Sequence, residues 1–320
     1  MKYKLLTLLS LAILFYSCVK KQDQAPESTA FLVIDDVFLQ LIDTTEVLQK
    51  VESGFQFTEG PAWSHKNYLL FSDTPASRIY QWSEEEGLRV YQEPSFNANG
   101  LAITSAGALL ICEHGNRLLR LVTEAGEEEV LANQYKGLRL NSPNDLSIKS
   151  DGSIYFTDPP YGLSLQDDDP EKELSFNGIY RYKNEELILL DSSMIRPNGI
   201  AFSPDEKYLY VAQSEIDPKW MRFSLDGDGN IIDENLFFDA AQLTGRGTPD
   251  GLKVDEHGNL FCSGPGGIVV ISPEGKHLGT ILTPEVSTNC AFGGADGKTL
   301  FITAQTSVYA IRLKVRGFSY

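Results

Sequence analysis

The sequence predicts an all-β fold, a six-bladed β-propeller with four-stranded blades, on the strength of two observations. The first is a repeat: six segments each carry a polar residue, four or five mostly apolar residues, a turn and a short aromatic strand. Their spacing of 39 to 54 residues is typical of one four-stranded blade. The repeats begin at Glu59, Asn99, Asn144, Asn198, Asp250 and Asn289.

The second observation is the regular content of each repeat. Every repeat has an apolar second strand followed by a small residue, and then a third strand, which gives six blades. Close packing near a crowded axis explains the small residues. The chain ends soon after the third strand of the sixth repeat, so we expect residues 47–55 to supply the missing strand and close the ring. The small residues are Ser72, Cys112, Thr157, Ala212, Ser263 and Thr303.

The N-terminus has the layout of an export signal. Lys2 and Lys4 precede an apolar run over residues 5–16, which ends at Ser17 and Cys18. This pattern predicts a lipoprotein signal peptide over residues 1–17 and a lipid on Cys18, with an ordinary signal peptide as the alternative. A polar tether, residues 18–30, would then join a single propeller domain, residues 31–320, to the bacterial cell envelope, in the periplasm or at the cell surface.

Composition narrows the classes of partner. The net charge is −17, and it becomes −19 when Lys2 and Lys4 are removed with the leader. A surface this acidic disfavours nucleic acid, because phosphate binding needs clustered Lys and Arg. Besides Cys18 the chain has three cysteines, too few for a disulfide framework. We expect a monomer with no nucleic-acid partner.

The residues that open the six repeats predict a metal site. At the start of the innermost strands they would surround one axis, so six oxygen-bearing side chains would converge at one mouth of the channel. Glu59 and Asp250 supply negative charge, and Asn144 and Asn198 supply amide oxygens. A ligand set of oxygen alone favours Ca²⁺ or Mg²⁺. The alternative for some of these residues is a structural role, such as capping the inner strands.

Several of these segments resemble the senescence-marker-protein/gluconolactonase family of six-bladed propellers, especially its bacterial members. The resemblance implies that Glu59, Asn198 and Asp250 hold a metal, with Asn144 ligating it or lying beside it. Ser142 stands where some animal members have an arginine, which leaves the sugar contacts of this chain open. The matching segments include residues 57–63 (FTEGPAW), 141–145 (NSPND), 155–162 (YFTDPPYG), 196–205 (RPNGIAFSPD) and 249–255 (PDGLKVD).

The resemblance also implies a chemistry, the hydrolysis of small lactones. One divalent cation, Ca²⁺ in preference to Mg²⁺ or Zn²⁺, would polarise the ester carbonyl, and Asp250 would be the catalytic general base. Asn99 and Asn144 would donate hydrogen bonds to the substrate, and Glu113 and His114 would face it, with an exposed loop pair as the alternative for these two. Two alternatives remain: a phosphotriesterase on the same metal site, or a tethered propeller that binds carbohydrate without turnover.

Overall fold

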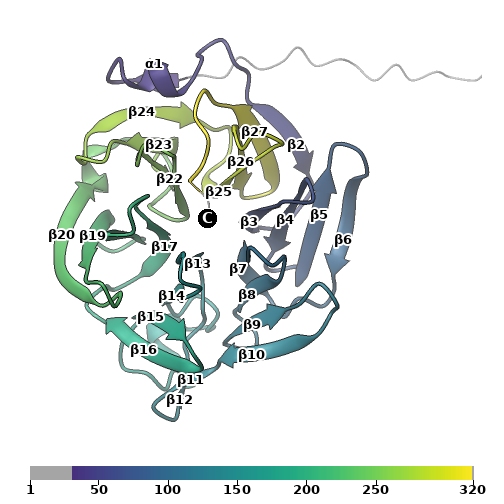
Figure 1. Cartoon of the computed structure of the whole chain (residues 1–320), viewed down its shortest axis with the longest axis vertical. Helices are drawn as coiled ribbons and strands as arrows, with labels where there is room; N and C mark the ends of the chain where they lie inside the picture. Colours follow the sequence, from purple (N-terminus) through teal and green to yellow (C-terminus); the bar gives the residue numbers. More distant parts are fainter. Residues whose placement is uncertain (1–30, 319–320) are drawn as a thin grey trace, which may run out of the picture.

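Six antiparallel sheets surround a central axis in the computed structural model, which describes residues 31–318 (Figure 1). The predicted signal peptide, the tether and Cys18 lie outside the described residues. Blades one to four each have four strands in sequence order, with the first strand innermost. Blade one contains β3 (Thr58–Ser64), β4 (Tyr68–Asp73), β5 (Arg78–Ser83) and β6 (Gly87–Gln92), and blade two contains β7 (Ala98–Ile103), β8 (Leu109–Glu113), β9 (Leu118–Val122) and β10 (Glu128–Ala132). Blade three contains β13 (Leu146–Ile148), β14 (Ile154–Asp158), β15 (Gly178–Lys183) and β16 (Glu186–Asp191), and blade four contains β17 (Pro197–Phe202), β18 (Tyr208–Gln213), β19 (Lys219–Leu225) and β20 (Ile231–Asp239).

The sixth blade closes the ring as predicted. It contains β25 (Ser287–Gly293), β26 (Thr299–Ala304) and β27 (Ser307–Arg312), and its outer strand is β2 (Gln49–Ser53) from the start of the chain. β2 pairs antiparallel with β27, with Gln49 opposite Ala310. This pairing covers the edge of β27 that would otherwise be open. The prediction of a six-bladed propeller closed by an N-terminal strand is therefore confirmed.

The fifth blade differs from the prediction because it has an additional strand. Its strands are β21 (Leu252–Val254), β22 (Leu260–Gly264), β23 (Gly267–Ile271) and β24 (His277–Leu282), and β1 (Phe31–Val33) adds a fifth at the outer edge. The short helix α1 (Phe38–Leu41) follows β1 and buries Phe38 and Leu41. The remaining elements are β11 (Gln134–Tyr135), β12 (Leu138–Arg139) and two 3₁₀ turns, η1 (Gln166–Asp168) and η2 (Ala240–Gln242).

The hydrophobic core lies between the blades rather than on the axis. Six clusters of buried apolar side chains each join two neighbouring blades. Between blades six and one, for example, Phe71 packs with Phe301 and Val308. Polar side chains are therefore free to line the axis. No helix among residues 31–318 combines the length and the apolar character needed to cross a bilayer.

Candidate metal centre and active site

The six repeat-opening residues all lie at the same end of the innermost strands. Glu59, Asn99 and Asn198 are each the second residue of β3, β7 and β17, and Asn289 is the third of β25. Asn144 and Asp250 each lie two residues before their inner strand. In Figure 1 these inner strands surround the axis. Asp250 is partly exposed, whereas the other five side chains are almost completely buried.

β-Bulges at the start of four inner strands re-aim these side chains. The register against the second strand shifts between Glu59 and Ala62, between Ala98 and Leu101, between Pro197 and Ile200, and between Ser287 and Asn289. A bulge inserts an extra residue and re-aims the side chains beside it. The repeated position of the bulge explains how strands of different blades present their repeat-opening residue in the same way.

Glycine follows four of the six residues because neighbouring inner strands approach very closely there. A Cβ on Gly199 would lie 2.2 Å from the carbonyl oxygen of Asp250, and one on Gly251 would lie 1.9 Å from Cγ of Asn289. No side chain fits at such distances. The glycine therefore lets each blade pack directly against the repeat-opening residue of the next.

Glu59 and Asp250 give the mouth its charge. Burial raises the pKa of Glu59 to about 7, opposed by the hydrogen bond from the amide of Gly60 and reinforced by the charge of Asp145. Burial, and then the charges of Glu59 and Asp145, raise the pKa of Asp250 well above its usual range, while the neighbouring Asn198 amide lowers it. The negative forms of these carboxyls would be favoured by a cation placed between them.

Asn289, which the repeats placed in the ring but not among the predicted ligands, lies directly against the site together with Asp145 and Lys253, which no sequence pattern assigned to it. Asn289 Nδ2 donates to Glu59 Oε2 (3.2 Å) and to Asp145 Oδ2 (3.3 Å). Lys253 Nζ lies 4.0 Å from Asp145 Oδ2 and offsets its charge. One feature of the sequence could have indicated that Asp145 belongs to the site: it occupies a position where four repeats have glycine.

His114 contacts the predicted ligand Asn144. Its Nε2 lies 3.4 Å from Asn144 Nδ2, and burial lowers its pKa to about 4, so the ring is neutral at pH 7. A hydrogen bond donated by Asn144 Nδ2 to a neutral Nε2 leaves the Asn144 carbonyl oxygen for the centre of the mouth. In this arrangement His114 orients Asn144.

Glu113 is directed away from the mouth. Its carboxylate is fully buried, forms an ion pair with Arg120 (2.5 Å) and accepts a hydrogen bond from Asn116 Nδ2 (2.7 Å). These contacts occupy both carboxylate oxygens. The structure thus places His114 and Glu113 in different surroundings, although they are adjacent in the sequence.

One unpartnered oxygen at the mouth is suited to a ligand. Among the described residues, nothing hydrogen-bonds to the buried Oδ1 of Asn99, while the buried hydroxyl of Tyr161 lies beside Ser214. The Tyr161 hydroxyl is close enough to Asp250 for that charge to raise its pKa, although burial is the larger cause. Buried polar groups without partners are uncommon and point to a partner supplied from outside.

The donor set fits a hard cation better than a softer one. Within residues 31–318 no three His, Cys, Asp or Glu side chains gather as a metal-binding group. The predicted ligands are two carboxylates, Glu59 and Asp250, and two amides, Asn144 and Asn198. Carboxylate and amide oxygens are ligands that Ca²⁺ accepts, with water completing its shell.

The fold and this mouth define a propeller with an acidic, amide-rich centre, and comparison with known proteins identifies its family. Residues 57–306 match the model of the SMP-30/Gluconolactonase/LRE-like region, and the chain belongs to this family. The gluconolactonase of Zymomonas mobilis is 36% identical over 303 residues, which cover 87% of this chain and 84% of that protein.

Solved structures of related proteins have the same propeller fold as this chain. A gluconolactonase from Xanthomonas campestris superposes with a TM-score of 0.80 at 32% identity, covering 88% of this chain and 94% of that one. The calcium-binding protein regucalcin from Agrobacterium tumefaciens has the same fold, with a TM-score of 0.70 at 20% identity over 84% of this chain and 94% of that one.

Proposed function

We propose that this chain is a metal-dependent hydrolase of small lactones. The observation that carries the proposal is the convergence of two carboxylates, Glu59 and Asp250, with amide side chains at one polar mouth. Family membership and the likeness to gluconolactonases support a lactone, such as an aldonolactone, as the substrate.

We assign the cation to Glu59, Asn144, Asn198 and Asp250, and Ca²⁺ is our first choice over Mg²⁺ or Zn²⁺. The raised pKa values of the two carboxyls and the free Oδ1 of Asn99 support a positive charge at this point. A bound divalent cation would polarise the lactone carbonyl and stabilise charge developing on its oxygen.

The side chains of the mouth have distinct roles in this proposal. Asp250 accepts a proton from the attacking water, since it is the partly exposed carboxylate of the ring. Asn99 and Asn144 donate hydrogen bonds to substrate oxygens. Tyr161, whose hydroxyl lies near Asp250, supplies one more donor.

Turnover with and without a chelator tests the proposal. Glucono-1,5-lactone hydrolysis followed by pH-stat should stop after metal removal and return when Ca²⁺ is added. A phosphotriester assayed in parallel separates the phosphotriesterase alternative. Lactone binding without any turnover in the cation-loaded protein would favour the non-catalytic alternative and would contradict the hydrolase.

We also propose that the protein is exported and held at the bacterial envelope by a lipid on Cys18, because its leader has the basic-then-apolar layout described above. Cys18→Ala should move the protein from the membrane fraction to the soluble fraction. The intact protein serves as the control. Full membrane retention of the variant would contradict lipid anchoring.

A further inference from the structure

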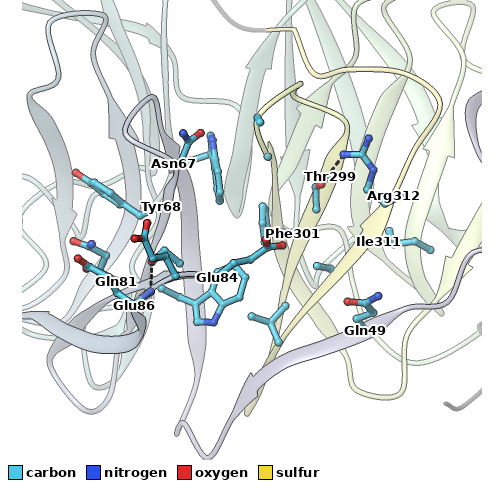
Figure 2. A pocket seen from close by; sticks show the side chains of 18 of the residues that line it. Gln49, Asn67, Tyr68, Gln81, Glu84, Glu86, Thr299, Phe301, Ile311 and Arg312 are labelled. Carbon is cyan, nitrogen blue, oxygen red and sulfur yellow. Dashed lines mark hydrogen bonds between the residues drawn. The ribbon is translucent and has the colours of Figure 1, made fainter. Parts of the chain in front are cut away.

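A cavity lies away from the acidic mouth, at the opposite end of the strands of the first blade. This groove has a volume of about 840 Å³ and is formed by strands of blade one together with β2, β26 and β27 of blade six (Figure 2). Trp63 lines it and lies four residues beyond Glu59 on β3. At roughly 3.3 Å per residue, this places the groove on the order of 13 Å from the mouth. The groove is therefore separate from the site proposed for lactone hydrolysis.

Aromatic rings form the centre of the groove. Trp63 stacks on Phe301, with ring centroids 5.0 Å apart and planes 10° from parallel. Trp82 meets the same Phe301 edge-on at 5.9 Å. Phe301 is buried, whereas both tryptophans remain partly exposed to the groove. Two indoles thus offer apolar ring surface to a ligand.

Polar groups without partners accompany these rings. Among the described residues nothing accepts a hydrogen bond from the indole N–H of Trp63 or Trp82, both of which line the groove. The side chain of Gln81, labelled in Figure 2, also lines the groove and brings an amide group to it. The amide and the two indole N–H groups can therefore form hydrogen bonds with a ligand that enters the groove.

The charges around the groove disfavour an anionic ligand. Glu84, Glu85 and Glu86 lie exposed at one side. Four cations line the groove: Arg312 pairs with Asp296 (2.7 Å), Lys66 with Glu124 (2.6 Å) and Arg89 with Glu86 (3.6 Å), while Lys50 lies over the ring of Tyr309. The matching ligand is neutral, with an apolar face for the indoles and hydroxyl groups for the amide and the N–H donors.

We propose that this groove binds a neutral oligosaccharide. A pyranose ring presents C–H groups on its face and hydroxyls at its edge, which is the combination that the aromatic floor and the free donors require. The volume is within the range of ligand sites and has room for more than one sugar ring. The protein would then hold a glycan on one face while its mouth opens on the other.

Tryptophan fluorescence tests the proposal directly, because the chain has three tryptophans and the third, Trp220, is fully buried. The full-length protein is titrated with maltohexaose, cellohexaose, laminarihexaose and chitohexaose, and with choline as a cationic probe. At least one hexasaccharide should give a saturable change in emission. The same titration by calorimetry should lose affinity by about 10-fold or more in Trp82→Ala.

Matched variants make the outcome decisive. Trp82→Phe keeps an aromatic ring and should lose less affinity than Trp82→Ala, and thermal unfolding shows whether each variant folds. Lactone turnover should be unchanged in both, and Asp250→Asn should bind the glycan normally. Absence of binding by all four hexasaccharides, binding of choline alone, or a glycan affinity that depends on Asp250 and not on Trp82 would overturn the proposal.

Discussion

Asp250 has two proposed roles, cation ligand and general base, and one substitution separates them. Asp250→Asn keeps an oxygen of similar size but cannot accept the proton from water. We expect lactone turnover to fall on the order of 10²-fold or more, the scale for losing a positioned general base. The rate at saturating Ca²⁺, measured by pH-stat, should remain low.

Asn198→Ala is the matched control for that experiment. It removes an amide ligand and leaves both carboxylates, so the cation should bind more weakly and excess Ca²⁺ should restore part of the activity. Recovery of Asp250→Asn to near the original rate at high Ca²⁺ would show that Asp250 is a ligand only. The base would then be sought at Glu59, since both oxygens of Glu113 are occupied by Arg120 and Asn116.

Arg120 and Glu113 form a buried ion pair that we interpret as contributing to the stability of the fold and not to catalysis. Their side chains are 5% and 0% exposed, so Arg120→Met would leave the Glu113 charge without compensation. We expect the free energy of unfolding to fall by about 3 kcal/mol or more in denaturant titrations. Glu128→Gln, which alters an exposed partner of the same arginine, should change it by less than about 1 kcal/mol. A folded Arg120→Met of normal stability that lacks turnover would instead place Glu113 in contact with substrate.

The sequence predicted the residues at the mouth better than it predicted their partners. Repetition identifies the residue that opens each inner strand, because the same local pattern occurs six times. Contacts between blades have no such signal: Asn289 lies 230 residues from Glu59 and 144 from Asp145. The repeats therefore placed Asn289 in the ring but could not predict its contacts with Glu59 and Asp145, nor that Lys253 lies beside Asp145.

At the scale of elements, two of the small residues, Ser72 and Thr157, connect adjacent blades, and the structure places each as the penultimate residue of its second strand. Close packing near the axis is the reason for small residues at these positions that the sequence suggests. In the structure, Ser72 Oγ donates to the carbonyl oxygen of Asn99 (2.8 Å), and Thr157 Oγ1 donates to that of Asn198 (2.8 Å). A hydroxyl from one sheet thus fixes the backbone of a ring residue in the next. These hydrogen bonds help to position the mouth.

The glycines after the ring residues lead to a prediction at the same scale. Gly199→Ala would place Cβ 2.2 Å from the Asp250 carbonyl oxygen and force blades four and five apart. We expect a loss of at least about 1–3 kcal/mol of stability, together with weaker Ca²⁺ binding by calorimetry. Gly227→Ala is the control, because a Cβ there meets nothing within 4 Å. Equal stability and equal Ca²⁺ affinity of the two variants would contradict a role for this close approach.

Strands that belong to a sequence repeat, or that a repeat requires for its completion, could be predicted, whereas a strand outside the repeats could not. The need to complete the sixth blade predicted the closing strand in residues 47–55, and β2 (Gln49–Ser53) lies within that range. β1 has only three residues and belongs to no repeat, so the sequence carries no comparable requirement for it. Its position follows from pairing with β24, which is 240 or more residues away in the chain.

At the scale of the whole molecule, stability and chemistry are separated in space. The apolar clusters join neighbouring blades around the ring, while the axis carries buried polar and charged groups. The fold therefore does not need a cation for its core. The carboxylates at the mouth nevertheless repel each other, so we expect the cation to add to the stability of an already folded propeller.

Metal removal tests this separation. Ca²⁺ at 100 times its dissociation constant should stabilise the folded protein by about 2.7 kcal/mol if it binds only that state. Chelation should therefore lower the Tm by several degrees in calorimetry and leave the far-ultraviolet circular dichroism spectrum unchanged. The Glu59→Gln/Asp250→Asn double variant should fold and show no response of Tm to Ca²⁺. Loss of the β-sheet spectrum on chelation would show that the cation is part of the core, and an unchanged Tm in the unmodified protein would contradict a cation at the mouth.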